Sequence, residues 1–237
     1  MPTTLFTVVV GSKLHGLDTP TSDTDIRGVF IHPLKNKLSP FQTVKNTSWI
    51  EGDVDNTSYE LADFCKQAVH GNATILEVFF SNQILTTSSI ADEMRENWRK
   101  FIDTDRMVMA SRGYASNQLN KMQLFEDKGI KDQSRTPKFA VAYCRVLWQC
   151  AEYLRTGSFP CQITDPELKA ILIKVKAGWA DAYIPELTER FSALQAEVTE
   201  AWKTAEKLTP DIGWIEDFIL RSYTQEVGAS TTSTIRC

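Results

Sequence analysis

Apolar and polar positions change their spacing along the chain, and this change divides it into two parts. Residues 5–10 form an apolar, β-branched run, and residues 23–31 alternate between polar and apolar, so both predict β-strands. A third short strand or a helix start is predicted over residues 58–61, after an Asp/Asn-rich loop. From Leu61 onward, apolar residues recur at three- and four-residue spacing, which is typical of amphipathic helices.

Nearly all of the chain after residue 86 shows the helical spacing. Pro137 suits the first turn of one such helix, and Gly157 suits its end. Residues 13–17 predict a short helical turn between the first two strands. Residues 228–237 are Ser/Thr-rich with few apolar groups, which favours a disordered tail. The expected helices cover residues 61–69, 75–80, 90–101, 104–125, 137–156, 165–176, 184–208 and 210–226.

This order of elements predicts an α+β fold. Residues 1–85 would form a small α/β domain with a mixed sheet, residues 86–227 a mostly helical domain, and residues 228–237 the tail. A chain of 237 residues is long enough to bury a substantial core in such an arrangement.

Composition changes this picture little. A hydrophobic share of 42% and a charged share of 24% are ordinary for a globular protein. No apolar run approaches the roughly 18 residues of a membrane span, and the N-terminus lacks a signal-peptide pattern, so we expect a cytoplasmic protein without membrane contact. The five cysteines form no CxxC pair, which leaves a zinc site or disulfide framework without support. A net charge of −4 does not indicate nucleic-acid binding by the whole surface. It leaves open that a local basic patch binds nucleic acid.

The candidate chemistry lies in "GSKLHGLDTPTSDTDIRGVF", residues 11–30. A strand that ends in Gly11-Ser12 and enters a short helix presents backbone N–H groups to phosphate oxygens, and the hydroxyl adds a donor. Asp23 and Asp25 are two residues apart, so a strand directs both carboxylates to one face. Two such carboxylates repel each other, and a hard cation such as Mg²⁺ relieves that repulsion. The alternative is an exposed Asp-x-Asp turn.

These residues resemble the DNA polymerase β-type nucleotidyltransferase superfamily, which has a Gly-Ser helix turn followed by Asp-x-Asp on a strand. The stretch is more closely similar to the YcgL-like branch, also described as the polymerase-β family of RNA repair pathways. The segment "YELADFCKQAVHGNATILEVFFS" resembles a second block of that branch. The resemblance covers residues 5–85 and runs more loosely through the helical part.

The resemblance implies roles for the motif residues. Gly11 and Ser12 would hold the β- and γ-phosphates of an incoming nucleotide. Asp23 and Asp25 would be catalytic and would bind two Mg²⁺ ions, with Mn²⁺ as an alternative metal.

The resemblance also implies a third carboxylate on a neighbouring strand, which helps to activate the attacking hydroxyl. Glu60 is our choice for this catalytic acid and metal ligand, because it lies at a strand-to-helix junction within the second block. Asp55 and Asp63 stay open as alternatives. Glu60 also suits the first turn of a helix, where the helix dipole favours an acid.

Five further residues are candidate nucleotide contacts. Lys13 and Arg27 flank the acids and can pair with phosphates or with carboxylates. Tyr114, Gln118 and Lys121 share one helix face, which suits base stacking and phosphate contact. The same spacing equally suits the ordinary surface of an amphipathic helix. Lys138 and Arg145, on the next predicted helix, would extend this nucleotide-contacting face.

The sequence thus predicts a Mg²⁺-dependent enzyme that moves a nucleoside monophosphate from ATP or another triphosphate to an acceptor hydroxyl. The sequence leaves three kinds of acceptor open: an RNA 3′ end (tRNA included), a protein hydroxyl and a small molecule. Two other readings are a non-catalytic nucleotide-binding or toxin–antitoxin-type regulator, and a helical interaction protein with an incidental acidic turn. A mere binder would not need both acids, which favours the enzyme. The sequence does not indicate an oligomeric state.

Overall fold

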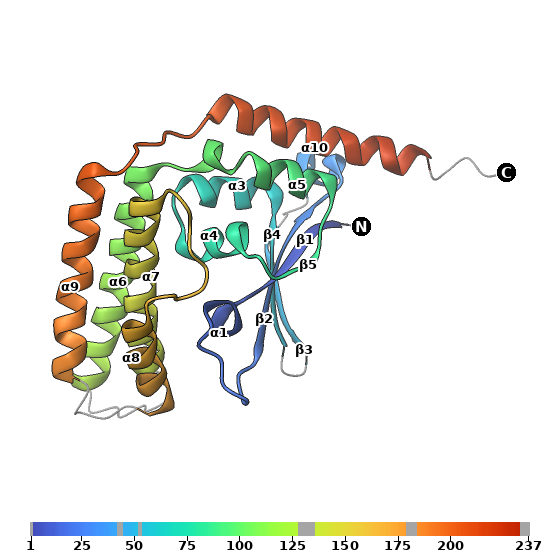
Figure 1. The fold of residues 1–237 in the computed structure, drawn as a ribbon. Helices are drawn as coiled ribbons and strands as arrows, with labels where there is room; N and C mark the ends of the chain where they lie inside the picture. Colours follow the sequence, from blue (N-terminus) through green and yellow to red (C-terminus); the bar gives the residue numbers. More distant parts are fainter. Residues whose placement is uncertain (1, 42–44, 52–53, 128–135, 179–183, 233–237) are drawn as a thin grey trace.

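A computed structural model of the chain describes residues 2–41, 45–51, 54–127, 136–178 and 184–232. A mixed sheet lies beside a bundle of long helices (Figure 1). In the described residues the sheet has the order β3-β4-β2-β1-β5. β2 and β4 run parallel, and the other neighbours run antiparallel, so the predicted α+β class is confirmed. The strands are β1 (Thr3–Val10), β2 (Thr24–Ile31), β3 (Thr47–Glu51), β4 (Val54–Glu60) and β5 (Ile84–Thr86).

The helices follow the predicted periodicity closely, with differences at a few ends. The helix predicted over residues 90–101 divides into α5 and a 3-10 turn, η1, and the one predicted to reach residue 208 ends at Thr204. The last helix continues to Thr232, so part of the tail that we expected to be disordered is helical; residues 233–237 lie outside the described ranges. The helices are α1 (Gly11–His15), α2 (Leu34–Leu38), α3 (Leu61–Val69), α4 (Ala73–Phe80), α5 (Ser89–Glu96), η1 (Trp98–Phe101), α6 (Thr104–Asp127), α7 (Thr136–Thr156), α8 (Pro166–Ala177), α9 (Ile184–Thr204) and α10 (Ile212–Thr232).

One hydrophobic core lies between the sheet and the helices that cover it. Phe6 of β1 packs edge-on against Phe64 of α3, which stacks on Phe79 of α4, each pair with ring centroids 5.9 Å apart. Phe101 of η1 and Phe218 of α10 are fully buried in the same core. α10 therefore returns to the first part of the chain and lies along α3 and α5 (Figure 1). The packing thus divides the chain differently from the boundary predicted near residue 86.

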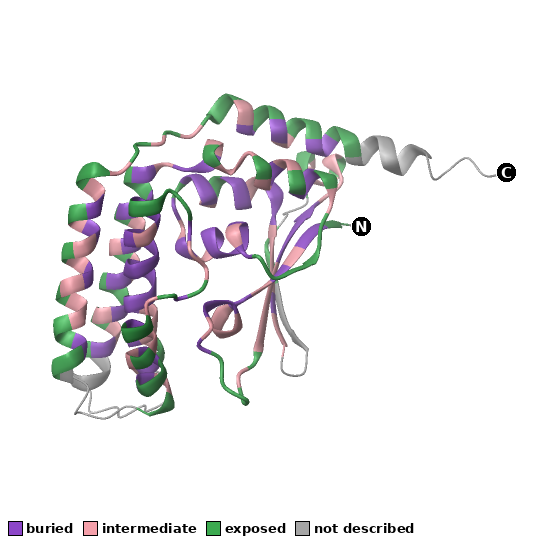
Figure 2. Cartoon of the chain, viewed as in Figure 1, coloured by how far each residue is buried: buried purple, intermediate pink, exposed green. Residues whose placement is uncertain are grey.

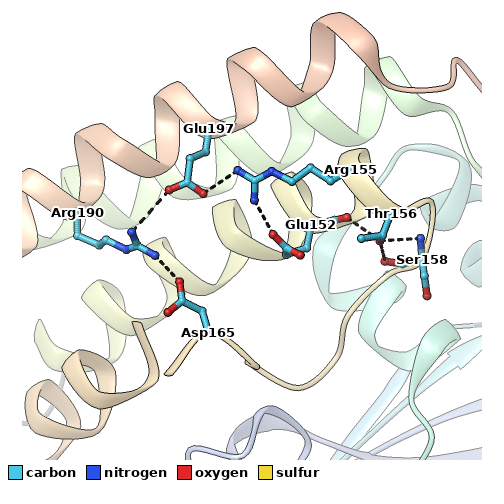
Figure 3. Close-up of polar contacts among 7 residues, drawn as sticks. All are labelled: Glu152, Arg155, Thr156, Ser158, Asp165, Arg190 and Glu197. Carbon is cyan, nitrogen blue, oxygen red and sulfur yellow. Dashed lines mark hydrogen bonds and ion pairs between the residues drawn. The ribbon is translucent and has the colours of Figure 1, made fainter. Parts of the chain in front are cut away.

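A second core holds α6, α7, α8 and α9 together. α7 lies at its centre and contacts the other three helices, and much of its ribbon has the purple of buried residues in Figure 2. At the surface, Arg155 of α7 pairs with Glu197 of α9 at 3.0 Å, and Arg190 of α9 pairs at 2.7 Å with Asp165, the N-cap of α8 (Figure 3). Exposed pairs of this kind contribute little each, so apolar burial holds the bundle. None of the described helices combines the length and apolar character needed to cross a membrane.

The turn between α3 and α4 touches α6 at Gly71. Its φ is +68°, and a Cβ there would lie 2.5 Å from Met107 Cα and 2.7 Å from Met107 N. Gly71→Ala should lower the free energy of unfolding by about 3 kcal/mol, because a strained left-handed residue and overpacking each cost roughly 1–3 kcal/mol. Gly113→Ala in α6 is the matched control: a Cβ there meets open space, and the change should raise stability by about 0.5–1 kcal/mol. Urea unfolding of both variants measures the difference, and equal stabilities would contradict this account.

Candidate active site

β1 leads directly into α1 through a turn that requires glycine. Gly11 has a φ of +70°, and a Cβ there would lie 2.0 Å from Asp25 Oδ2. Only glycine therefore lets the Asp25 carboxylate approach this turn. Val10 provides no side-chain cap to α1, which leaves the N–H groups of the first turn for an anionic ligand. Ser12 lies in this turn, and its carbonyl accepts a 2.9 Å hydrogen bond from Leu17 N as α1 closes.

The parallel pairing of β2 with β4 brings two acids together. Asp23 directly precedes β2, and Asp25 within β2 lies opposite Asp55 of β4. Arg27 Nη2 lies 3.7 Å from Asp25 Oδ1 and 3.5 Å from Asp55 Oδ2. Its Nη1 also donates to the carbonyls of Ile26 and Asp55 at 3.0 Å. The guanidinium thus neutralises two carboxylates on adjacent strands. Arg27 therefore has the carboxylate partners that the sequence suggested, and its contact with a nucleotide stays a prediction.

The carboxyl of Asp25 is perturbed mainly by its burial. Burial raises the pKa of Asp25 above its ordinary value, and the nearby carboxylates of Asp23 and Asp55 raise it further. Arg27 and, more weakly, Lys138 act in the opposite direction without cancelling the rise. Carboxylates perturbed in this way are frequent at functional sites and at cation sites.

The structure places Glu60, predicted as the third acid, away from this acidic group. It lies opposite Phe30, at the far end of β2 from the Asp25–Asp55 pair. Five residues along a strand separate Glu60 from Asp55, and at about 3.3 Å per residue this is roughly 16 Å. Asp55, which the sequence left open as an alternative, is instead the carboxylate on the neighbouring strand that lies opposite Asp25.

Glu60 has a structural role at the far end of β4. Its side chain is 1% exposed and accepts from Ala62 N as the N-cap of α3. It also pairs with Lys37 at 2.5 Å and accepts a hydrogen bond from the Tyr223 hydroxyl of α10. Asp63, the other alternative, accepts hydrogen bonds from Asn46 and Gln67 at this same end. A hollow of 490 Å³ here is lined by Lys37, Lys45, Asn46, Glu60 and Asp63.

The carboxylates around Asp25 are ligands of the kind that a hard divalent cation prefers. They do not, however, converge on one point where such a cation would bind. In the part of the chain that the structure describes, no three His, Cys, Asp or Glu side chains converge closely enough to hold a metal ion. Arg27 instead contacts both Asp25 and Asp55. Mg²⁺ usually takes one or two protein carboxylates and completes its shell with phosphate and water, so these acids fit it in chemistry. Binding between Asp25 and Asp55 would require the guanidinium to move.

A lysine of the helical bundle reaches the loop that carries Asp23. Lys176 of α8 donates to Leu17 O at 2.9 Å and lies 3.3 Å from Ser22 Oγ. Burial lowers the pKa of Lys176, while the carboxylates of Asp18, Asp23 and Asp25 favour its charged form. The sequence analysis missed this residue, because a lysine late in an amphipathic helix gives no signal beyond a solvated face.

Two other lysines lie near the acids. Lys138 of α7 is close enough to Asp25 and to Lys176 to influence both titrations. Lys13 of α1 donates from Nζ to Thr24 Oγ1, directly beside Asp25. The helical bundle and the sheet therefore both contribute cations around the acids, and the nucleotide contact predicted for Lys13 stays a prediction.

The face predicted on α6 does not form an open wall. Gln118 is 4% exposed, so the structure does not place it on an accessible face, and its predicted nucleotide contact finds no support in this arrangement. Burial raises the pKa of Tyr114, and Lys121 Nζ lies 5.5 Å from the Phe139 ring centroid. Nothing in the described residues joins Tyr114 or Lys121 to the acids by a hydrogen bond or ion pair, and their nucleotide contacts stay predictions.

A Gly-Ser turn that opens a short helix, followed by acids on two adjacent strands of a mixed sheet, is the arrangement of the polymerase β-type nucleotidyltransferases that the sequence resembles. The chain belongs to the RNA repair pathway DNA polymerase beta family (RlaP), whose model matches residues 2–222.

The chain also has a curated relative and a weak structural likeness. It is 30% identical over 229 residues to the uncharacterized protein MJ0002 of Methanocaldococcus jannaschii. The aligned region covers 86% of this chain and 87% of that protein. Among solved structures, it is similar to a nucleotidyltransferase-like protein from Exiguobacterium sibiricum 255-15, with 10% identity and a TM-score of 0.33. That match covers 85% of this chain and 69% of the other.

Glu60→Gln tests the structural role of Glu60. It removes the charge from a buried ion pair, and because hydrogen bonds to charged groups contribute about 1.5–3 kcal/mol, the free energy of unfolding should fall by about 2 kcal/mol. Glu206→Gln, which removes an exposed partner of Arg99, should change it by less than about 0.5 kcal/mol. Guanidinium chloride unfolding measures both. If the Glu60 variant is as stable as its control, Glu60 has no such role.

Proposed function

We propose that this protein is a Mg²⁺-dependent nucleotidyltransferase. The observation that carries the proposal is the register of Asp25 with Asp55 on adjacent parallel strands, next to the Gly11 turn. Membership in the RNA repair pathway DNA polymerase beta family supports the reaction class. An acceptor hydroxyl would attack the α-phosphorus of a nucleoside triphosphate. The new oxygen–phosphorus bond forms as the bond to pyrophosphate breaks.

The side chains of the site have separate roles in this reaction. The N–H groups of Gly11 and Ser12, with the Ser12 hydroxyl, would bind the β- and γ-phosphates at the start of α1. Asp55 would accept the proton of the attacking hydroxyl. Asp23 and Asp25 would hold Mg²⁺, which would supply charge neutralisation on the phosphates when bound. Catalysis would come mainly from positioning and charge neutralisation.

An RNA 3′ end, tRNA included, is the acceptor that we propose. The description of the family names RNA repair, and lysines of α7 and α8 lie beside the acids, where a polyanion would enter. The formal net charge of −4 means that any attraction for RNA would be local to this site. A protein hydroxyl or a small molecule would use the same chemistry, and both are outcomes of the test below.

Transfer of label tests the proposed function. The protein is incubated with Mg²⁺ and each α-labelled triphosphate, together with RNA, protein and small-molecule acceptors. Label should pass to one acceptor class, and EDTA should abolish the transfer. Asp55→Asn should reduce the rate on the order of 10²–10⁴-fold, as expected for loss of a general base. Asp23→Asn and Asp25→Asn should abolish detectable transfer.

Glu60→Gln is the control for these substitutions, because Glu60 lies at the other end of β4. Below its melting temperature it should transfer label at the wild-type rate. A loss equal to that of Asp55→Asn would return the third acid to Glu60. Nucleotide binding without transfer to any acceptor would favour the regulator, and the absence of both binding and transfer would reject the assignment.

A further inference from the structure

A ring of buried polar contacts lies beneath α1 and joins it to the helical bundle. His15, the last residue of α1, has Nε2 3.2 Å from Glu77 Oε2 in α4. The other oxygen of Glu77 pairs with Nη1 of Arg145 in α7. Arg145 donates to Gln149 Oε1 at 2.9 Å, and Gln149 donates to Pro160 O at 3.0 Å.

The backbone closes this ring. Ile163 N donates to His15 O at 3.1 Å, so the segment after α7 returns to the residue at which the contacts begin. The four residues are almost fully enclosed, at 6% exposed for His15, 5% for Glu77, 9% for Arg145 and 1% for Gln149. The ring therefore links α1, α4 and α7 through buried contacts.

Burial and neighbouring positive charges both act on the pKa of His15. Burial lowers the pKa of His15 well below its ordinary value, and the positive charges of Arg145 and Lys176 add to this. Burial also lowers the pKa of Arg145, to about 10, so the guanidinium stays charged near pH 7. With a neutral imidazole, the 3.2 Å approach of Nε2 to Glu77 Oε2 is a close polar contact rather than an ion pair, and its geometry is not that of a hydrogen bond. Arg145 is thus the cation of the ring, and Glu77 is held between it and His15.

α1 depends on such contacts for its position. It has five residues and no side-chain cap, and a helix this short does not form without tertiary packing. Leu14 fixes its apolar side in the sheet core, and His15 fixes its polar side. Gly11 and Ser12 lie at the opposite end of the same helix, so a rotation of His15 would turn them away from Asp25.

We propose that Glu77 and Arg145 are positioning residues for the nucleotide site: through His15 they orient α1 so that Gly11 and Ser12 face Asp25. The inference rests on the proposed function, because it concerns the binding of a triphosphate at that turn. It assigns the helical bundle a role in preparing the phosphate site, in addition to the lysines at its rim.

Calorimetric titration with the Mg²⁺ complexes of ATP, GTP, CTP and UTP tests the proposal, at a temperature where circular dichroism shows each variant folded. For the triphosphate that the wild type binds, Glu77→Gln and Arg145→Met should each raise Kd at least about tenfold, since a displacement of about 1 Å can cost on the order of a hundredfold. The binding stoichiometry should stay at the wild-type value. A fall in stoichiometry at constant Kd would show loss of folded protein and would overturn the proposal.

Arg155→Met is the matched control. It removes an arginine from the same helix, but one whose partners, Glu152 and Glu197, lie on the bundle surface away from α1 (Figure 3). Its Kd should equal that of the wild type, and a Kd raised as much as in Arg145→Met would overturn the proposal.

The double variant Glu77→Gln/Arg145→Met separates positioning from stability. It leaves no unpaired buried charge, so its melting temperature should exceed that of Arg145→Met, while its Kd should stay raised. A return of Kd to the wild-type value would show that the ring only stabilises the fold. If the wild type binds none of the four triphosphates, the proposed function fails and this inference fails with it. If all variants bind as the wild type does, only this inference fails.

Discussion

Asp25 and Asp55 lie side by side because β2 and β4 run parallel in one register, and the candidate site depends on this pairing. The side chains of a strand alternate between faces, so a shift by one residue would send one acid to the opposite side of the sheet. The same register places Glu60 at the far end of β4, where it caps α3 and anchors α10. The pairing of β2 with β4 thus places Asp55 in the candidate site and Glu60 at a position where it stabilises the fold.

A pair of carboxylates in a partly buried position needs positive charge nearby. Arg27 supplies it within the sheet, and Lys138 and Lys176 approach from the helical bundle. The bundle therefore belongs to the electrostatics of the site, although its own core is separate. Lysines of the bundle near the acids and the contact of His15, at the end of α1, with Glu77 bring the two parts of the chain together around the candidate site.

The helices were predictable because each has a periodic apolar face and local end signals. Asn72 caps α4 by accepting from Thr74 N, and Gly157 takes a φ of +70° after α7. The strands were harder, since β4 carries polar residues at its site end and reads as a loop in sequence. Gln118 was placed on an open face from spacing alone, yet the face it lies on is covered by the bundle. Spacing along one helix does not reveal which side another helix will cover.

The sequence by itself determined the α+β class, the helical segments and the Gly11-Ser12 turn with Asp23 and Asp25, since these follow from local periodicity and short motifs. Only the tertiary structure decided that Asp55 is the acid beside Asp25, because the partner of a strand is not written in its own sequence. It also decided that α10 returns to the first core, that lysines of the bundle reach the acids, and that a buried ring supports α1. These are contacts between residues far apart in the chain, and they arise only when the separate elements pack.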